Sequence, residues 1–286
     1  MSRGFKVLNT SKLISFIDDK KEYTLHIAEG QKLVHDLAII HDLKGKGFAF
    51  FRDCVLSAIP LITLLKPKEN LGLYIDSEDP FFMFKVEMSE EGYFRTLLMP
   101  EAFNDFPEKL MGRARLTKIF PGQKNPYNSV IELNQTSLNE AVNIILTESY
   151  QIKGKVILSQ DSDQVAFLMQ LPRKNWDKEE EFEPSQEIGD KLKEIEKPLN
   201  ELFKKGSNED SFIAKEVESM GFQHLKSKEV NFKCACSYER MVTGVLSLVQ
   251  STSLDNVFEQ DSSIETKCDY CKTFYKIPKD HIASLV

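Results

Sequence analysis

The sequence Cys234-Ala235-Cys236, followed after residues 237–267 by Cys268-Asp269-Tyr270-Cys271, gathers four of the five cysteines near the end of the chain. Two close pairs of thiols, separated by the length of a small domain, are typical of a tetrahedral zinc site. Zinc suits such a set because it binds thiolate sulfur well and is redox-inert. We therefore predict one Zn²⁺ per chain, held by Cys234, Cys236, Cys268 and Cys271.

The first pair is closer in sequence than the C-x-x-C pairs of ordinary zinc ribbons. Its two side chains point to the same side of an extended segment. They can also join each other in a short, strained ring, and strained disulfides are the labile, regulatory kind. The spacing therefore indicates a site that holds zinc when reduced and releases it when oxidised.

Zinc is also expected to hold the surrounding residues, 231–286, in their fold. A segment this short rarely builds a sufficient core alone. Structural zinc contributes roughly 10–16 kcal/mol in small finger peptides, whereas whole domains are stable by only about 5–15 kcal/mol. Loss of zinc should therefore unfold this region.

The composition places the chain among soluble globular proteins. It has 286 residues, 41% of them hydrophobic and 28% charged, with a net charge of −7. This charge argues against a general binder of nucleic acid or of anionic membranes. The longest apolar stretch, 54–65, contains Pro60 and is shorter than the roughly 20 residues of a membrane span. With no secretory signal in view, we expect a cytoplasmic protein whose cysteines are metal ligands or redox devices.

Three regions differ in composition, and the first is 1–172. Strands are expected at 21–27, 71–75, 81–88, 155–159 and 164–171, and in the last of these Val165, Phe167, Met169 and Leu171 share one face. A helical pattern covers 33–43, and an apolar helix that should be buried covers 48–65. Ser137 and Glu140 form a capping-box signature for a helix that ends near 150. Because strands and helices mix without a βαβ rhythm, the fold class is α+β.

The second region, 173–230, is a charged helical linker: 18 of the 33 residues at 173–205 are charged. An apolar stripe at helical spacing runs from Ile188 to Leu202, but Gly189 and Pro198 interrupt it. In a helix interior Pro costs about 3 kcal/mol and Gly about 1 kcal/mol. The helix should therefore be marginal unless its stripe docks elsewhere. The region is either a plain surface linker or a metastable switch, which loosens with the third region if it docks there.

The third region, 231–286, should form the zinc module. A helical face follows the first cysteine pair at 241–249, a strand, turn and strand cover 264–277, and a short helix starts at Pro278. Three alternatives compete with a redox switch. They are a purely structural zinc ribbon, a nucleic-acid-binding ribbon and a dithiol oxidoreductase using Cys268 and Cys271. The region has six Lys/Arg against seven Asp/Glu, which disfavours the second; a C-x-x-C outside a βαβ setting disfavours the third.

Other candidate sites are weak. His35 and His41 lie six residues apart, so on one helix they cannot face the same metal, and we expect both on a polar face. Cys54 lies in an apolar run and should be an inert core thiol. His224 and His281 lie near the zinc module in sequence, but four cysteines already complete the ligand set. No grouping of catalytic residues stands out, so we predict a protein that is not an enzyme.

The cysteine motifs, with the flanking residues 232–240 and Tyr275, resemble the heat-shock protein 33 family of redox-regulated bacterial chaperones. The resemblance covers the C-x-C, the gap of about thirty residues and the C-D-Y-C form. The order of the regions also fits, and residues 165–172 look like the family's strand that ends its first domain. The resemblance implies that 1–172 binds clients and takes part in dimerisation, that 173–230 is the metastable linker, and that 231–286 is the redox switch.

The mechanism that the resemblance implies is as follows. The reduced, zinc-bound protein is a poor chaperone. Oxidants form Cys268–Cys271 first and Cys234–Cys236 second, zinc leaves, and the switch and the linker unfold. The exposed surfaces then hold unfolding client proteins without ATP, with a homodimer as a possible active form. Thioredoxin- or glutaredoxin-type reductants reset the switch, and clients pass to ATP-dependent chaperones. The alternative function is a redox-insensitive zinc-ribbon adaptor for protein partners.

Overall fold

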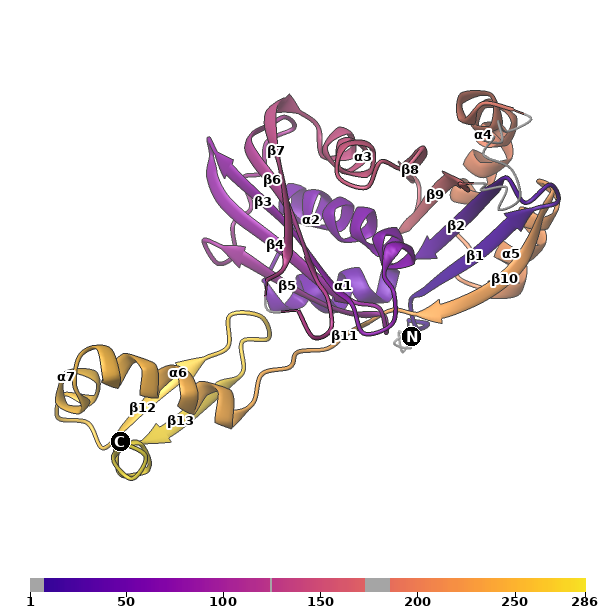
Figure 1. Cartoon of the computed structure of the whole chain (residues 1–286). Helices are drawn as coiled ribbons and strands as arrows, with labels where there is room; N and C mark the ends of the chain where they lie inside the picture. Colours follow the sequence, from indigo (N-terminus) through magenta and orange to yellow (C-terminus); the bar gives the residue numbers. More distant parts are fainter. Residues whose placement is uncertain (1–7, 124, 173–185) are drawn as a thin grey trace, which may run out of the picture. The chain divides into compact units, whose positions relative to one another are not determined.

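The computed structural model describes residues 8–123, 125–172 and 186–286. The chain divides into two compact units, Met1–Phe232 and Lys233–Val286 (Figure 1). This division lies two residues after the sequence-based boundary at 230. The front part of the expected linker, 173–185, falls outside the described residues.

The first unit contains a five-stranded antiparallel sheet, called here the small sheet. Its strand order is β10-β1-β2-β9-β8. The strands are β1 (Lys12–Asp18), β2 (Tyr23–Glu29), β8 (Gly154–Leu158), β9 (Gln164–Gln170) and β10 (Phe222–Glu229). The sequence predicted β2 and the β8–β9 hairpin but neither β1 nor β10. The edge strand β10 comes from within the expected linker and pairs with β1 over its whole length.

The second sheet of this unit, the large sheet, has the order β11-β5-β4-β3-β6-β7. Its strands are β3 (Asn70–Glu78), β4 (Phe81–Ser89), β5 (Tyr93–Met99), β6 (Leu110–Ile119), β7 (Tyr127–Thr136) and β11 (Asn231–Phe232). All neighbours are antiparallel except β11, which pairs in parallel with Tyr93 and Phe94 of β5. The sequence predicted only β3 and β4 of this sheet.

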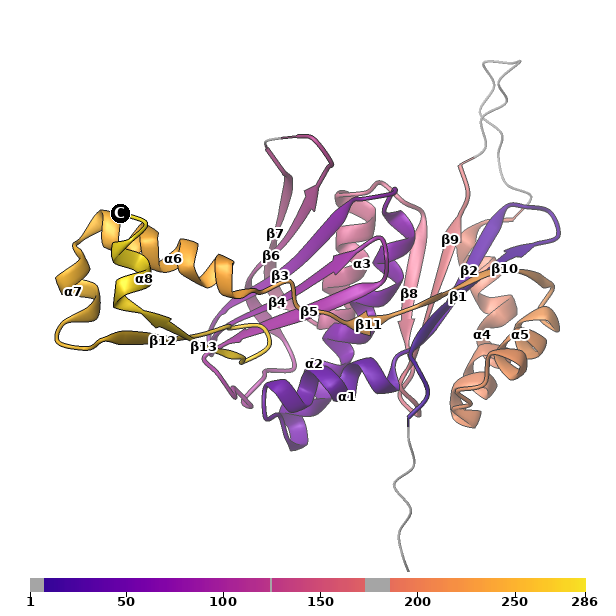
Figure 2. The same ribbon diagram turned by 90° about the horizontal axis from the view of Figure 1, so that it is seen from below.

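Helices α1 (Gln31–Ile40), α2 (Gly45–Ala58) and α3 (Leu138–Glu148), with the 3₁₀ segment Ile59–Leu64, pack against the large sheet and one face of the small sheet (Figures 1 and 2). The capping box at the start of α3 is confirmed: the Ser137 hydroxyl accepts from the Glu140 N–H, and the Glu140 carboxylate accepts from the Ser137 N–H. One main core therefore joins both sheets through these helices.

The stretch Gly45–Leu64 is long and apolar enough to pass a length-and-composition test for a membrane-spanning helix, and 61% of its most apolar window is buried inside the protein. Helix α2 is wholly buried at Phe51, Cys54 and Val55. Burial of this degree is that of a core helix, which agrees with the expectation of a buried helix at 48–65.

The small sheet is apolar on both faces. Val165 and Phe167 of β9 face the main core, as the sequence predicted, and Met169 packs at its margin. The neighbouring Ala166 and Leu168 are also buried, in a second core on the opposite face. The expectation of a strand with one buried face was thus incomplete, because a second layer covers the other side.

That second layer is formed by α4 (Ile188–Lys205) and α5 (Asp210–Glu218) (Figures 1 and 2). The stripe of α4 buries Ile195, Leu199 and Leu202 in a core that also contains Ile14 and Phe16 of β1. The described part of the linker therefore packs on the first unit.

The helix was expected to be marginal unless its stripe docks, and α4, which contains both Gly189 and Pro198, does dock its stripe on the small sheet. Gly189 lies in the first turn, where Ile188 directly follows the N-cap residue Glu187. Pro198 lies in the helix interior, next to the fully buried Leu199. Burial of a leucine-sized side chain contributes about 1.5–3 kcal/mol. Several such side chains on one stripe offset the cost of about 3 kcal/mol for Pro198.

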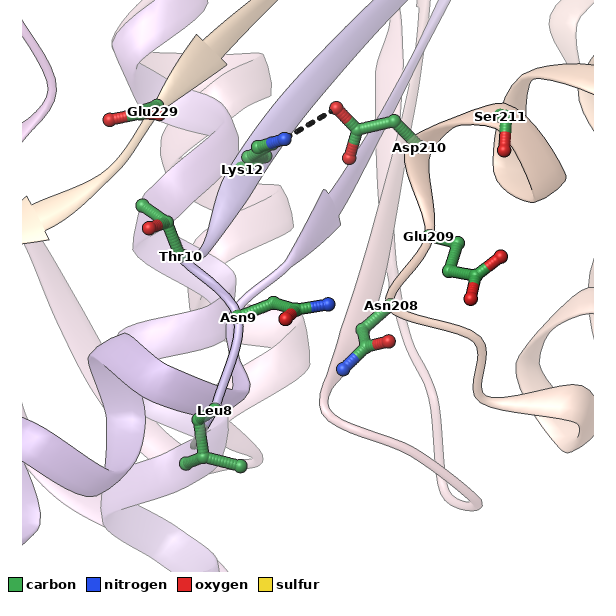
Figure 3. Close-up of a pocket in the computed structure, with 9 residues that line it drawn as sticks. All are labelled: Leu8, Asn9, Thr10, Lys12, Asn208, Glu209, Asp210, Ser211 and Glu229. Atoms are coloured by element: carbon green, nitrogen blue, oxygen red, sulfur yellow. Dashed lines mark hydrogen bonds and ion pairs between the residues drawn. The ribbon is translucent and has the colours of Figure 1, made fainter. Parts of the chain in front are cut away.

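A polar pocket lies where the start of β1 meets the start of α5 (Figure 3). Lys12 Nζ is 2.7 Å from Asp210 Oδ2, so an ion pair ties the sheet to the second layer there. The other lining residues are Leu8, Asn9, Thr10, Asn208, Glu209, Ser211 and Glu229. None is a cysteine or a histidine, so this pocket is unrelated to the site that the sequence predicts.

The two histidines at 35 and 41 differ in their surroundings. His35 is half-buried on α1 beside the Phe48 ring. His41 directly follows α1 and is buried, with Nε2 2.9 Å from Thr96 Oγ1 and 3.2 Å from the Thr96 carbonyl oxygen. The expectation of a polar-face His41 was therefore wrong. The helix ends before it, and the next turn carries the ring inward against Phe51.

The second unit is built from α6 (Tyr238–Ser251), α7 (Leu254–Phe258), the hairpin of β12 (Ser263–Lys267) and β13 (Phe274–Pro278), and α8 (Lys279–Ala283). Helix α6, the β12–β13 hairpin and α8 match the helix, strand pair and last helix that the sequence predicted, whereas α7 was not predicted. The fully buried apolar core is small: Val242, Val245, Val249, Phe258, Ile277 and Ile282.

His26 generates a prediction about acid stability. It is buried on β2, with its ring nitrogens 2.9 Å from Ser15 Oγ and 3.1 Å from Thr24 Oγ1. Burial, with a smaller contribution from Lys226, lowers the pKa of His26 to about 4. Between pH 6.5 and 4 the unfolded chain takes up a proton that the folded chain does not. Stability is therefore lost as the pH falls through this window.

Urea unfolding of the reduced protein at pH 7 and pH 5, beside His26→Gln, measures this contribution. The free energy of unfolding should drop by about 2 kcal/mol more in the native sequence than in the variant. An equal drop in both proteins would show that His26 does not titrate with folding.

Candidate metal centre

The cysteine pairs occupy two connecting segments of the second unit. Cys234 and Cys236 lie in the extended segment before α6, and Ser237 caps that helix by accepting from the Arg240 N–H. Cys268 and Cys271 lie in the turn between β12 and β13. Strand pairing fixes the two sides of this turn, and the cap fixes the start of α6, so both motifs are held by their flanking elements.

The two motifs meet. All four sulfur atoms lie within 4.8 Å of one another. Across the motifs, Cys234 Sγ is 3.7 Å from Cys268 Sγ, and Cys236 Sγ is 3.3 Å from Cys271 Sγ. Zinc–sulfur bonds of about 2.3 Å in a tetrahedron separate the sulfurs by about 3.8 Å. The donor set therefore fits a single metal ion of zinc's size and preference, and among the described residues no other group of three or more potential ligands forms.

Hydrogen bonds to backbone carbonyl groups hold each motif in place. The Arg240 guanidinium donates to the carbonyl oxygen of Ala235, between the first two cysteines, at 2.8 Å. In the second motif the Cys268 N–H donates to the Thr273 carbonyl at 2.9 Å, and the Lys272 N–H donates to the Cys268 carbonyl at 2.8 Å. Lys272 has a φ of +59°, a left-handed conformation that is costly for a residue with a side chain. The turn after Cys271 is thus held against a local backbone preference.

Two hydroxyl groups lie next to the sulfurs. Tyr275 Oη is 3.1 Å from Cys236 Sγ, and Thr273 Oγ1 is 3.2 Å from Cys271 Sγ. Each can donate to a thiolate, and hydrogen bonds of this kind orient metal ligands. From the sequence, Tyr275 was noted only as part of a family pattern and Thr273 was not noted. Thr273 lies two residues and Tyr275 four residues after Cys271, and this closeness in sequence was the one sign that their hydroxyls could reach the sulfurs.

The thiols differ in acidity. Burial opposes ionisation of Cys271, but hydrogen bonds with Thr273 and with the neighbouring thiols outweigh it and lower the pKa to about 7. Burial is the largest cause that raises the pKa of Cys234 to about 12, and it also raises the pKa of Cys268. Because thiolates are the species that bind metals and react with oxidants, Cys271 is a more readily available ligand and nucleophile than Cys234 or Cys268.

The remaining candidate residues lie apart from the sulfurs. Cys54 is fully buried on α2, and its burial raises the thiol pKa, as expected for an inert core thiol. His224 is exposed on β10 of the first unit. His281 stacks on Tyr238, with Nδ1 2.7 Å from the tyrosine hydroxyl. Neither histidine belongs to the sulfur cluster.

Comparisons with known proteins agree with this arrangement. A family model described as "Hsp33 protein" matches residues 11–278. Two relatives named 33 kDa chaperonin, from Streptococcus pneumoniae strains JJA and Hungary19A-6, are each 27% identical over 173 residues. Each match covers 58% of this chain and 57% of the relative, so it spans little more than half of either protein.

A solved structure has the same fold. The crystal structure of the 33 kDa chaperonin, a heat shock protein 33 homologue from Thermotoga maritima, superposes with a TM-score of 0.73. The match covers 97% of this chain and 98% of that one, at 16% sequence identity. The α+β class and the presence of a cysteine cluster in the last region are thereby confirmed.

Removing zinc from the loaded protein with a chelator should unfold the second unit and leave the first folded. The second unit buries only six apolar side chains fully, and a core of this size needs a metal to be stable. Hydrogen exchange measures both units at once: protection should vanish in α6 and persist in β2. Retained protection in α6 after complete chelation would contradict the prediction.

Tyr275→Phe should weaken zinc binding by about 10- to 100-fold, because loss of a hydrogen bond to a metal ligand has this range of effects. Competition with a chromogenic zinc chelator gives the affinity. Tyr238→Phe is the matched control, since it removes a tyrosine hydroxyl from the same unit that contacts His281 rather than a sulfur. Equal affinities of the two variants would exclude the role of Tyr275.

Proposed function

The chain belongs to the Hsp33 family, and from this membership and its four-sulfur cluster we propose that it is a redox-regulated, ATP-independent holdase chaperone. The observation that carries the proposal is the convergence of Cys234, Cys236, Cys268 and Cys271 within 4.8 Å. The same four residues are proposed as the ligands of one Zn²⁺ in the reduced protein and as the redox-active pairs. A bound zinc ion would supply the cross-link that holds the second unit folded.

Oxidation is proposed to begin at Cys268 and Cys271 and to continue at Cys234 and Cys236. In each pair a thiolate attacks the oxidant and is oxidised at sulfur, and the second thiol then attacks that sulfur and displaces its leaving group, hydroxide or chloride, to form the disulfide. Two thiols thereby lose two electrons and two protons, and one peroxide molecule becomes two water molecules. Hypochlorous acid would yield chloride, water and a proton instead.

Loss of the thiolates removes the ligands of the metal, because a disulfide sulfur carries no charge and is a poor donor. The second unit, with its small core, then unfolds. The chain runs back from Cys234 through β11 and β10 to α5 and α4, so loss of the second unit frees one end of this segment. We propose that residues 173–230 act as the metastable linker and that 1–172 carries the client surface.

The contacts by which the linker packs on the small sheet support the proposal that it can be released from the sheet and can pack there again. Its contacts with the small sheet combine a buried stripe on α4 with exposed or half-exposed ion pairs such as Lys12–Asp210. Exposed ion pairs contribute little to stability, so the stripe supplies most of the docking free energy. Undocking would expose the stripe and the face of β1 that carries Ile14 and Phe16. Unfolding proteins could bind there through apolar contacts.

The proposed partners are unfolding client proteins, thioredoxin- or glutaredoxin-type reductants that restore the thiols, and ATP-dependent chaperones that receive clients. In the oxidised state the chain is also proposed to form a homodimer. The protein would act in the cytoplasm and without catalysis. The net charge of −7 supports the exclusion of nucleic acid and anionic membranes as general partners.

Light scattering of a heat-unfolding client, without ATP, tests the function. Peroxide-treated protein should suppress aggregation, whereas reduced, zinc-loaded protein should not. Cys268→Ser should abolish the difference between the two treatments, since neither the complete ligand set nor the first disulfide can form. Cys54→Ala is the control and should keep the difference, because Cys54 lies outside the cluster. Equal behaviour of both forms of the native sequence would instead favour a redox-insensitive zinc-ribbon adaptor.

A further inference from the structure

The small sheet ends in a strand that belongs to the linker. Strand β10 is the edge of the order β10-β1-β2-β9-β8, and it pairs with β1 from Lys12–Glu229 to Asp18–Phe222. The pairing contains one irregularity, between Ser15 and Phe16. When β10 is in place, β1 is an internal strand with a neighbour on each side. Without β10, β1 would become an open edge of seven residues.

Strand β10 contributes its backbone and few side chains. Only Phe222 is buried among its eight residues, and six of the other seven are exposed. Strand β1, in contrast, buries Leu13, Ile14 and Phe16 almost fully. The attraction between the two strands is therefore mainly that of main-chain hydrogen bonds. Any extended polypeptide can supply these bonds.

The attachment of β10 also depends on the segment that leads to the metal centre. Residues 230–233 alone separate β10 from Cys234. Within them the Val230 N–H donates to the Ser11 carbonyl, and the Asn231 N–H donates to the Gly92 carbonyl, each at 2.9 Å. Phe232 packs at the margin of the main core. Disorder that starts at the cysteines must therefore break these contacts, and free the almost fully buried Val230, to reach the end of β10.

We propose that β10 is a guard strand and that, once it is released, extended segments of unfolding proteins pair with the β1 edge in its place. This inference rests on the proposed function and names its binding mode. The favoured segment carries apolar residues at alternate positions, because successive side chains of a paired strand face opposite sides of the sheet. On the linker side such residues would meet Ile14 and Phe16, and on the other side the margin of the main core near Leu13.

The occupant is an unfolding client rather than a specific peptide, because β10 itself buries only one apolar side chain, Phe222. A strand that is mostly polar yields its place to one that buries more apolar surface, since burial contributes about 25 cal/mol per Å². The backbone pairing sets no sequence, and the flanking apolar residues favour segments that are normally buried in a folded core. Selection of this kind recognises an unfolded state and suits a holdase.

Hydrogen exchange on the full chain tests the inference, with reduced, carboxymethylated α-lactalbumin as a permanently unfolded probe. In the reduced protein both 12–18 and 222–229 should be protected. After oxidation, exchange should speed up at least tenfold throughout 222–229 and at the amides of 12–18 that face β10, because the other amides of β1 stay paired with β2. Addition of the probe should restore protection at 12–18 while 222–229 stays unprotected. Suppression of client aggregation is measured on the same samples.

The possible results of this experiment distinguish a failure of the proposed binding mode from a failure of the proposed chaperone function. If aggregation is suppressed but 12–18 stays unprotected with the probe bound, the binding mode is overturned and the chaperone function stands. If oxidation alone restores protection at 12–18 as protein concentration rises, a second copy of the chain occupies the edge and the inference is overturned. If aggregation is not suppressed at all, the proposed function fails.

A variant pair provides a second measurement. Lys226→Thr with Ser227→Thr raises the strand propensity of β10 and should hold it on β1 after oxidation. Probe binding should then fall at least fivefold, with zinc release unchanged. Lys155→Thr, a similar change at an exposed position of the opposite edge strand β8, should leave probe binding unchanged. Equal probe binding by both proteins would overturn the inference.

Discussion

The small sheet is the element on which the first unit depends, because both of its faces are apolar and both must be kept from water. One face shares the main core with the large sheet and helices α1 to α3. The other needs α4 and α5, which come from a highly charged part of the chain. A sheet of this kind gains stability from two layers at once. Under the proposed function, this second layer is the part of the first unit that would be released.

The second unit has a smaller apolar core, with six buried side chains. This core leaves the two cysteine segments to be joined by an interaction other than apolar contacts. Hydrogen bonds from Arg240 and within the 268–273 turn place the sulfurs. They do not replace a core. Under the proposed function, this difference between the units would let a chemical change at four sulfurs act on one unit while the other stays folded.

The sequence predicted elements whose signals are local. Ser137 and Glu140 of the capping box are three residues apart, and the turn between β3 and β4 is equally short. Within each cysteine pair the two residues are also close in sequence. Strand β10 carried no such signal, because its side chains are mostly exposed and its partner β1 lies some two hundred residues away in sequence. His41 was misplaced because the end of α1 decides its direction. Within the metal centre the four cysteines were recognised, but the hydroxyls of Thr273 and Tyr275 depend on how the hairpin folds over them.

The pairing of β1 with β10 has a further consequence during synthesis. Residues 12–18 leave the ribosome early, but their partner at 222–229 follows only after most of the chain has been made. At about 5–20 residues per second, the nascent chain would wait roughly 10–40 s before the small sheet can be completed. During that interval β1 has only one of its two neighbours, β2, and its other edge is open on a growing polypeptide. A protein of this topology would therefore be vulnerable to misassembly on crowded polysomes, and early formation of helices α1 to α3 with strands β3 to β7 would limit that exposure.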